Sequence, residues 1–165
     1  MHSYALNHKS HGFSLIEILL VLGLIGSMAV AAFLLYPRMM LAQDVSKAEQ
    51  KYIAITGAAR EYFGDSPYVG ISNAMMVSAG VAETSDLVSP WGLIDLQPSS
   101  SGDGFRVDFH DVPREACQRL VARLELFSAE ISAGTTPIKS STTAYNSITA
   151  PGACGITQIV SFSPG

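Results

Sequence analysis

The chain has 165 residues, which is enough for one domain of ordinary size. Its formal net charge is −4 and its sequence pI is about 5.4, values that argue against a nucleic-acid-binding protein, because such proteins need a basic face. Apolar residues make up an ordinary 48% of the sequence, but they are concentrated near the N-terminus.

The N-terminal residues 1–12 are polar, and an apolar run of 24 residues, 13–36, follows them with Glu17 as its one charged side chain. As a helix this run is roughly 36 Å long, enough to cross the hydrocarbon layer of a membrane. A secretory signal peptide has a shorter apolar core with a small-residue cleavage site after it. Here the small residue, Gly12, precedes the run, so an ordinary signal peptide does not fit.

The stretch from Gly12 to Glu17 reads G-F-S-L-I-E and, with the apolar run behind it, resembles the type IV prepilin family. The resemblance implies that residues 1–12 are a leader, which a prepilin peptidase removes by cutting between Gly12 and Phe13. It also implies that the new amine of Phe13 is methylated. Glu17 then matches the family's acid, which meets the N-terminal amine of a neighbouring subunit during assembly.

A carboxylate in a membrane-length segment needs a reason, because burying it without a partner costs free energy. Pairing Glu17 with an ammonium group recovers much of that cost, and a wrong axial register between subunits leaves both charges unpaired. The alternative is a tolerated charge that reaches the lipid headgroups. We favour the assembly role because the glycine, the phenylalanine, the acid and the apolar run occur together.

From residue 37 to residue 64 the pattern becomes amphipathic. Pro37 is expected to kink or loosen the helix, and Gly64 with the following Pro67 is expected to end it. The pattern predicts one helix of about 50 residues, whose second half packs on a sheet, with a coiled coil as the alternative. Its apolar stripe contains Leu41, Val45, Ala48, Tyr52, Ile55, Ala59 and Tyr62.

The remaining residues, 65–165, predict a globular head, which makes the fold class α+β, with the long helix packed on an antiparallel sheet as in the pilin fold. We expect a short helix at 75–77, a loop at 89–104 with at most a short strand, and a strand at 105–110. A helix at 113–131, a surface loop at 132–151 and a last strand at 156–162 follow. The inner side of the 113–131 helix is predicted to contain Val112, Ala116, Leu120, Leu124 and Phe127.

Two cysteines, Cys117 and Cys154, lie in this head. If the apolar run carries the head across a membrane, they reach an oxidising compartment and are expected to form a disulfide; two unrelated buried thiols are the alternative. The bridge would join the 113–131 helix to the last strand. This plan resembles the type IVb branch of the family, whereas the short leader and Phe13 resemble type IVa.

The sequence contains no catalytic or nucleotide-binding motif, so we expect neither an enzyme nor a cofactor. His110 beside Asp108 and Asp111 can bind a cation, but a polar strand end explains these residues as well, and we favour that reading and expect no metal. No acid follows Glu130, which argues against the calcium loop of a major pseudopilin. Without its leader the chain has nine Lys and Arg against fourteen acids, so nucleic-acid binding is not favoured.

The family resemblance implies a structural subunit of a type IV pilus, specifically a type IVb major pilin. Such a subunit waits in the inner membrane as a single-pass protein and is joined by the inner-membrane assembly machinery to copies of itself in an extracellular filament. The filament would serve adhesion, aggregation or conjugative mating, and the hydroxyl-rich segment 132–149 is predicted to contact other cells or phage. The alternatives are a minor pilin, a type II secretion pseudopilin, and a membrane-anchored periplasmic binding module or enzyme.

Overall fold

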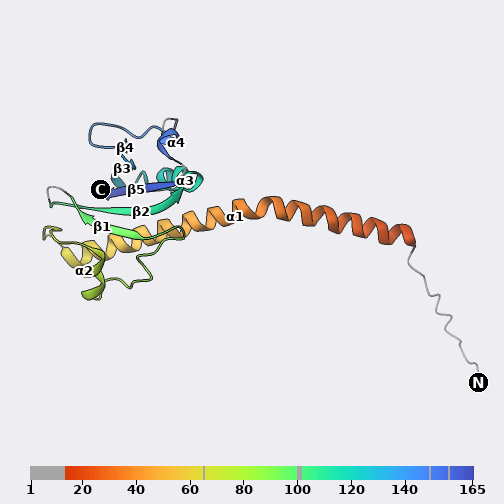
Figure 1. The fold of residues 1–165 in the computed structure, drawn as a ribbon, viewed down its shortest axis with the longest axis horizontal. Helices are drawn as coiled ribbons and strands as arrows, with labels where there is room; N and C mark the ends of the chain where they lie inside the picture. Colours follow the sequence, from red (N-terminus) through yellow and green to blue (C-terminus); the bar gives the residue numbers. More distant parts are fainter. Residues whose placement is uncertain (1–13, 65, 100–101, 149, 156) are drawn as a thin grey trace, which may run out of the picture. The chain divides into compact units, whose positions relative to one another are not determined.

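The computed structural model describes residues 14–64, 66–99, 102–148, 150–155 and 157–165. The chain divides into two units, Met1–Met40 and Leu41–Gly165. Helix α1 (Leu15–Phe63, 49 residues) belongs to both units, and its helical backbone continues through Pro37 (Figure 1). The single long helix predicted from the sequence is therefore confirmed, and its amphipathic half belongs to the head.

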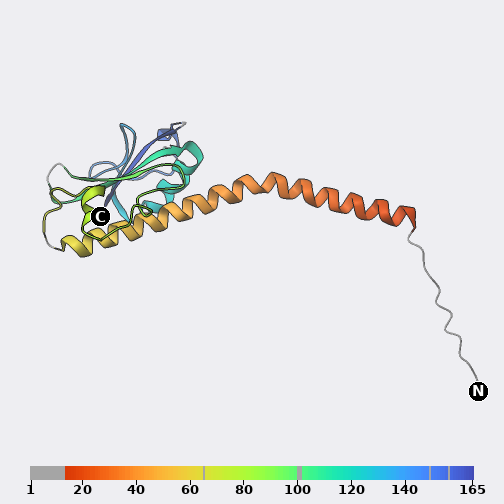
Figure 2. The same ribbon diagram turned by 60° about the horizontal axis from the view of Figure 1, so that its bottom comes forward.

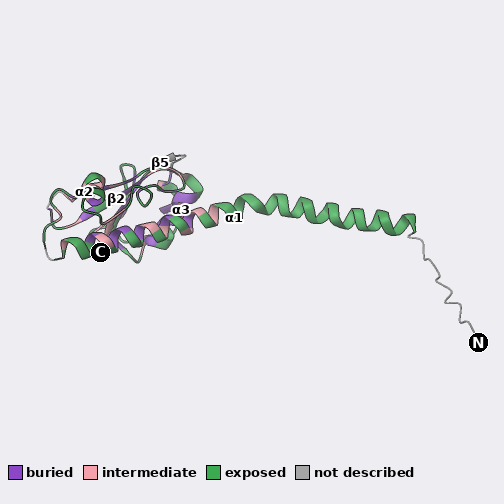
Figure 3. Cartoon of the chain, turned by 90° about the horizontal axis from the view of Figure 1, so that it is seen from below, coloured by how far each residue is buried: buried purple, intermediate pink, exposed green. Residues whose placement is uncertain are grey.

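The first part of α1 is exposed along its described length. Every described residue from 14 to 40 is exposed (Figure 3), including Phe33, which is 84% exposed. The most apolar 18-residue stretch of α1 has a mean hydropathy of 2.7. By length and composition, this helix is able to cross a membrane.

The second part of α1 buries the predicted stripe against the head. The buried residues are Val45, Ala48, Tyr52, Ile55, Thr56 and Ala59. The prediction missed Thr56, whose hydroxyl donates to the carbonyl oxygen of Tyr52 at 2.7 Å and so keeps a hydrogen bond despite its burial. The prediction was wrong for Tyr62, which is 53% exposed. In the last turn the neighbouring Phe63 makes the inward contact instead, with its ring 5.0 Å from that of Tyr68.

The head contains a five-stranded antiparallel sheet with the order β1-β2-β5-β3-β4. Its strands are β1 (Ile94–Pro98), β2 (Phe105–Pro113), β3 (Ser128–Ala133), β4 (Thr136–Lys139) and β5 (Thr157–Pro164). Strand β1 is the short strand that the loop prediction allowed, and β5 confirms the predicted last strand. Strand β5, the last strand in the sequence, lies at the centre and joins the two halves of the sheet.

A bulge lets β2 run further than predicted. The register of β2 against β5 shifts between Phe109 and Val112, and Asp111 has a φ of 56° there. In a regular strand, residues three apart point to opposite faces. The extra residue of the bulge changes that alternation, so Phe109 and Val112 are both completely buried.

Two predictions after residue 124 were wrong. Helix α3 (Arg114–Leu124) ends seven residues before the predicted end, and residues assigned to helix or loop form β3 and β4. Phe127, predicted to face inward, is 52% exposed in the turn after α3. The predicted loop 132–151 also includes the start of helix α4 (Ala150–Ala153). The reason is tertiary: β3 supplies the second neighbour of the central strand β5, and that pairing overrides the helical pattern of the local sequence.

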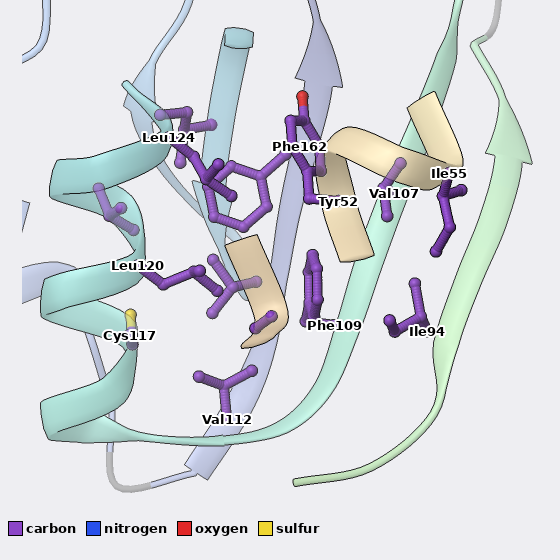
Figure 4. Close-up of a cluster of buried hydrophobic side chains, with 14 of the residues drawn as sticks. Tyr52, Ile55, Ile94, Val107, Phe109, Val112, Cys117, Leu120, Leu124 and Phe162 are labelled. Atoms are coloured by element: carbon purple, nitrogen blue, oxygen red, sulfur yellow. The ribbon is translucent and has the colours of Figure 1, made fainter. Parts of the chain in front are cut away.

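The core lies between the sheet and the two helices α1 and α3 (Figure 4). The ring of Phe162 on β5 is 5.7 Å from the ring of Tyr52 on α1 and 5.9 Å from that of Phe109 on β2, with edge-on geometry in both pairs. The hydroxyl of Tyr52 lies 3.0 Å from the Ser128 hydroxyl. Burial raises the pKa of Tyr52, so this tyrosine stays neutral and hydrogen-bonded around neutral pH.

The outer edge of β1 is closed by a side chain of the predicted short helix, α2 (Asn73–Ser78). The amide of Asn73 donates to the carbonyl oxygen of Ile94 at 2.7 Å and accepts from the backbone N–H of Leu96 at 2.9 Å. It thus occupies the groups that a further strand would use, which protects the edge from pairing with another chain.

The core position of Phe162 and the exposed position of Phe127 form a matched pair for mutation. We expect Phe162→Ala to lower the free energy of unfolding by about 3–5 kcal/mol, because it leaves a cavity between two aromatic rings. Phe127→Ala should cost less than about 1 kcal/mol because the side chain is half exposed. Urea unfolding of the full chain in detergent micelles measures both, and equal losses would contradict the core described here.

Candidate functional site

The residues of the predicted processing site, Gly12 and Phe13, lie outside the described residues. Glu17 is described and lies in the first turn of α1, where its backbone N–H donates to the carbonyl oxygen of Ser14 at 2.9 Å. Its side chain is exposed, and within the described part of the chain it makes no ion pair or side-chain hydrogen bond. The carboxylate is therefore accessible to a group from outside the described residues.

The predicted disulfide is present in the head. Cys117 on α3 is bonded to Cys154, which follows α4, with the two Cα atoms 6.0 Å apart. Both cysteines are buried. The bridge attaches α3 to the segment that leads into the central strand β5, and it encloses β3, β4 and the loop after them.

Two glutamines that the sequence did not single out support this attachment. Gln118 donates to the carbonyl oxygen of Pro151 at 3.2 Å. Gln158 on β5 donates to the Cys117 sulfur and accepts from the backbone N–H of Gly155 at 2.9 Å. An isolated polar residue on a helix or strand carries no pattern that reveals its partner, so only the fold identifies these two side chains.

The hydroxyl-rich loop inside the bridge is anchored at both ends. Before it, Lys139 donates to the carbonyl oxygens of Glu125 and Ser128 at 2.6 and 2.7 Å. Ser140 and Thr143 exchange backbone hydrogen bonds, and Tyr145 packs against the core. Burial, and then the charge of Glu125, raise the pKa of the Tyr145 hydroxyl. The loop thus presents the exposed side chains of 141–144 and 146–148 on a fixed base.

The acids and the histidine considered for a cation do not converge. Asp108 lies 2.9 Å from the Nε of Arg106, while His110 Nε2 lies 3.0 Å from an Asp95 oxygen on the neighbouring strand. Asp111 is exposed at the bulge. Among the described residues, no group of three or more His, Cys, Asp or Glu side chains is arranged to hold a metal ion. Asp108 is buried in the middle of β2, so the three residues do not form the exposed polar strand end expected from the sequence.

Comparisons with known proteins match the N-terminal segment to a family model and the fold to a solved structure. The model of the prokaryotic N-terminal methylation motif matches residues 7–33, which include Gly12, Phe13 and Glu17. The fold is similar to the crystal structure of TcpA, a type IV pilin from Vibrio cholerae El Tor biotype. The TM-score is 0.60 at 17% sequence identity, and the match covers 74% of this chain and 99% of that chain.

The chain has a type IV pilin fold behind a prepilin methylation motif. No curated protein matches the sequence. The predicted α+β fold and the predicted N-terminal methylation motif are therefore confirmed.

The disulfide predicts a specific stability loss. We expect the double variant Cys117→Ser/Cys154→Ser to lose about 4 kcal/mol of unfolding free energy, because the bridge restricts an unfolded loop of about 38 residues. Urea unfolding with and without a reducing agent measures the difference. The reductant should lower the unfolding free energy of the unmodified chain toward that of the variant and leave that of the variant unchanged. Equal stability of the unmodified chain and the variant without reductant would contradict the prediction.

Proposed function

We propose that this chain is the structural subunit of a type IV pilus. A prepilin peptidase removes residues 1–12 by cutting between Gly12 and Phe13, and the mature chains polymerise into a helical filament. The observation that carries the proposal is the methylation motif at the start of α1, whose described residues up to 40 are all exposed in the single chain. Such an apolar surface needs a bilayer before assembly and neighbouring helices after it.

Glu17 supplies the specificity of this assembly. When α1 of one copy enters a bundle of helices, its carboxylate is removed from water and needs a cation. The amine of Phe13 on a neighbouring copy is such a cation, and it meets Glu17 in one axial register only. The exposed carboxylate in the first turn of α1 supports this role.

The proposed location changes with assembly. Before assembly the chain is a single-pass protein of the inner membrane, in contact with the peptidase and the assembly machinery. Afterwards it is part of an extracellular filament with the heads on the outside. We assign it to the type IVb major pilins because the disulfide encloses most of the C-terminal half of the head. The proposed role in adhesion, aggregation or conjugative mating uses the exposed loop 140–148, and the chain itself performs no catalysis.

The proposed processing predicts the mature N-terminus. Mass spectrometry of the chain from its native membrane should find a protein that begins at Phe13 and carries one added methyl group. Gly12→Val should leave the leader attached, because a branched side chain replaces the small residue at the cut. Gly26→Ala is the matched control, since a Cβ there meets no other side chain, and it should be processed normally. An intact leader on the unmodified chain would contradict the proposal.

The proposed role of Glu17 predicts a defect in assembly without a defect in processing. We expect Glu17→Ala to reduce sheared surface filaments by roughly tenfold or more, since a factor of ten corresponds to only 1.4 kcal/mol and an unpaired buried ammonium costs more. Glu61→Gln, which changes an exposed acid in the head half of α1, should leave the filament yield unchanged. Electron microscopy and the composition of the sheared filaments measure the outcome. If the chain is a minor component of the filaments, the major-pilin assignment is wrong.

A further inference from the structure

We propose that a short hairpin of the head, residues 88–93, lies in the lipid–water interface of the membrane that anchors the unassembled chain, with Trp91 as its interfacial residue. This inference rests on the membrane anchoring in the proposed function. It adds a second membrane contact, made by the head itself, to the one made by α1.

The hairpin is held rigidly. Val88 and Leu93 form an antiparallel bridge, and the backbone N–H of Ser89 donates to the carbonyl oxygen of Gly92 at 2.8 Å. The Ser89 hydroxyl accepts from the N–H groups of Trp91 and Gly92 at 3.2 and 3.1 Å and donates to the Gly92 carbonyl oxygen at 2.9 Å. Ser89 therefore satisfies the backbone N–H groups of Trp91 and Gly92 within the turn, which lowers the cost of moving them out of water.

The base of the hairpin is fixed on β2. The N–H of His110 donates to the carbonyl oxygen of Leu93 at 3.0 Å. A Cβ added to Gly92 would lie 3.0 Å from an Asp111 carboxylate oxygen and 3.1 Å from the His110 carbonyl oxygen, so only glycine fits there without displacement. The hairpin is thus a fixed part of the head surface.

The outer side of the hairpin is apolar. Val88 and Leu93 are 45% and 47% exposed, and Pro90 is exposed between them. Trp91 is partly buried and packs against the core, but part of its surface stays accessible. Tryptophan prefers the membrane interface because its ring is apolar and its N–H group is polar.

The hairpin lies at the end of the head where α1 enters. Strand β1 begins at Ile94, directly after the hairpin, and ends at Pro98 opposite Phe105. The rings of Phe105, Tyr68 and Phe63 are in contact, so the far end of β1 coincides with the end of α1. Figures 1 and 2 agree that β1 starts at the opposite end, where α1 enters the head.

This end of the head is also the one connected most directly to the apolar run. The run ends at Tyr36, five residues before the head begins at Leu41. Lys51 donates to the carbonyl oxygen of Ser85, which places the segment leading into the hairpin beside the middle of the head half of α1. Residues 37–40 are thus the whole connection between the apolar run and the unit that carries the hairpin.

A bilayer fits the hairpin better than a second copy of the chain does. The apolar side chains of one six-residue turn cover far less than the roughly 800 Å² per partner of a standard protein interface. Contact with the lipid interface needs no matching shape and is stabilised by the buried apolar area alone. The interface is therefore the occupant that this small, rigid, apolar turn favours.

The test uses Trp91 as its own probe, because it is the one tryptophan in the sequence. The full chain is reconstituted in phosphatidylethanolamine–phosphatidylglycerol vesicles, and anchoring is verified by resistance to alkaline carbonate extraction. Lipids brominated close to the headgroup should reduce Trp91 fluorescence roughly twofold relative to unbrominated vesicles, because the indole lies at that depth.

Two variants separate the hairpin contact from a general effect. Val88→Ser/Leu93→Ser should lose most of the quenching while the chain stays carbonate-resistant. Val69→Ser is the matched control, because Val69 is 72% exposed and contacts Gly102 near the other end of the head, and it should leave the quenching unchanged.

The remaining outcomes overturn the inference in distinguishable ways. Unquenched Trp91 in carbonate-resistant vesicles overturns the hairpin contact and leaves the proposed function intact. If Trp91 becomes protected only in assembled filaments, its partner is a second copy and the lipid contact is wrong. Extraction of the chain by carbonate overturns the membrane anchoring and the inference with it.

Discussion

An apolar helix with an exposed surface is the constraint on which the rest of the structure depends. The described residues up to 40 are all exposed, although they form the most apolar stretch of α1. At about 25 cal/mol for each Å² of apolar surface, leaving such a helix in water is very unfavourable. The folded single chain is therefore incomplete by itself, and its environment, whether lipid or other helices, completes it.

The head, in contrast, buries the second half of the same helix and holds it firmly. Tyr52 contacts the ring of Phe162 and the hydroxyl of Ser128, so α1 is attached to the central strand and to its neighbour β3. The bridge from Cys117 to Cys154 then connects α3 with the segment before that central strand. These contacts attach the helix to the middle of the sheet.

As proposed, one subunit exists in two states. In the membrane, the apolar half of α1 is covered by lipid, and the hairpin around Trp91 rests in the lipid interface. In a filament, neighbouring helices replace the lipid and Glu17 gains the amine of another copy. In both states the same apolar surface of α1 is covered, so exchange between them needs no refolding of the head.

Some features of this protein follow from the sequence alone because they depend on neighbours along the chain. The 3.6-residue period of the stripe from Leu41 to Ala59 predicts the buried face of α1, and the alternation at 105–110 predicts a strand with one buried face. The motif from Gly12 to Glu17 is read directly from consecutive residues, and the two cysteines allow a single pairing. No knowledge of the sheet is needed for any of these.

Other features were decided only by the tertiary structure, because they depend on contacts between residues distant in sequence. The segment after Leu124 has a helical pattern, yet it becomes β3 because the central strand β5 needs a second neighbour. The change from helix to strand also moves Phe127 to the surface, and Val112, predicted for the inner side of a helix, is instead buried on β2 through the bulge at Asp111. Strand pairing is a long-range interaction that leaves no local pattern, so the end of α3, the order of the strands and the glutamine contacts beside the disulfide could not be predicted from the sequence.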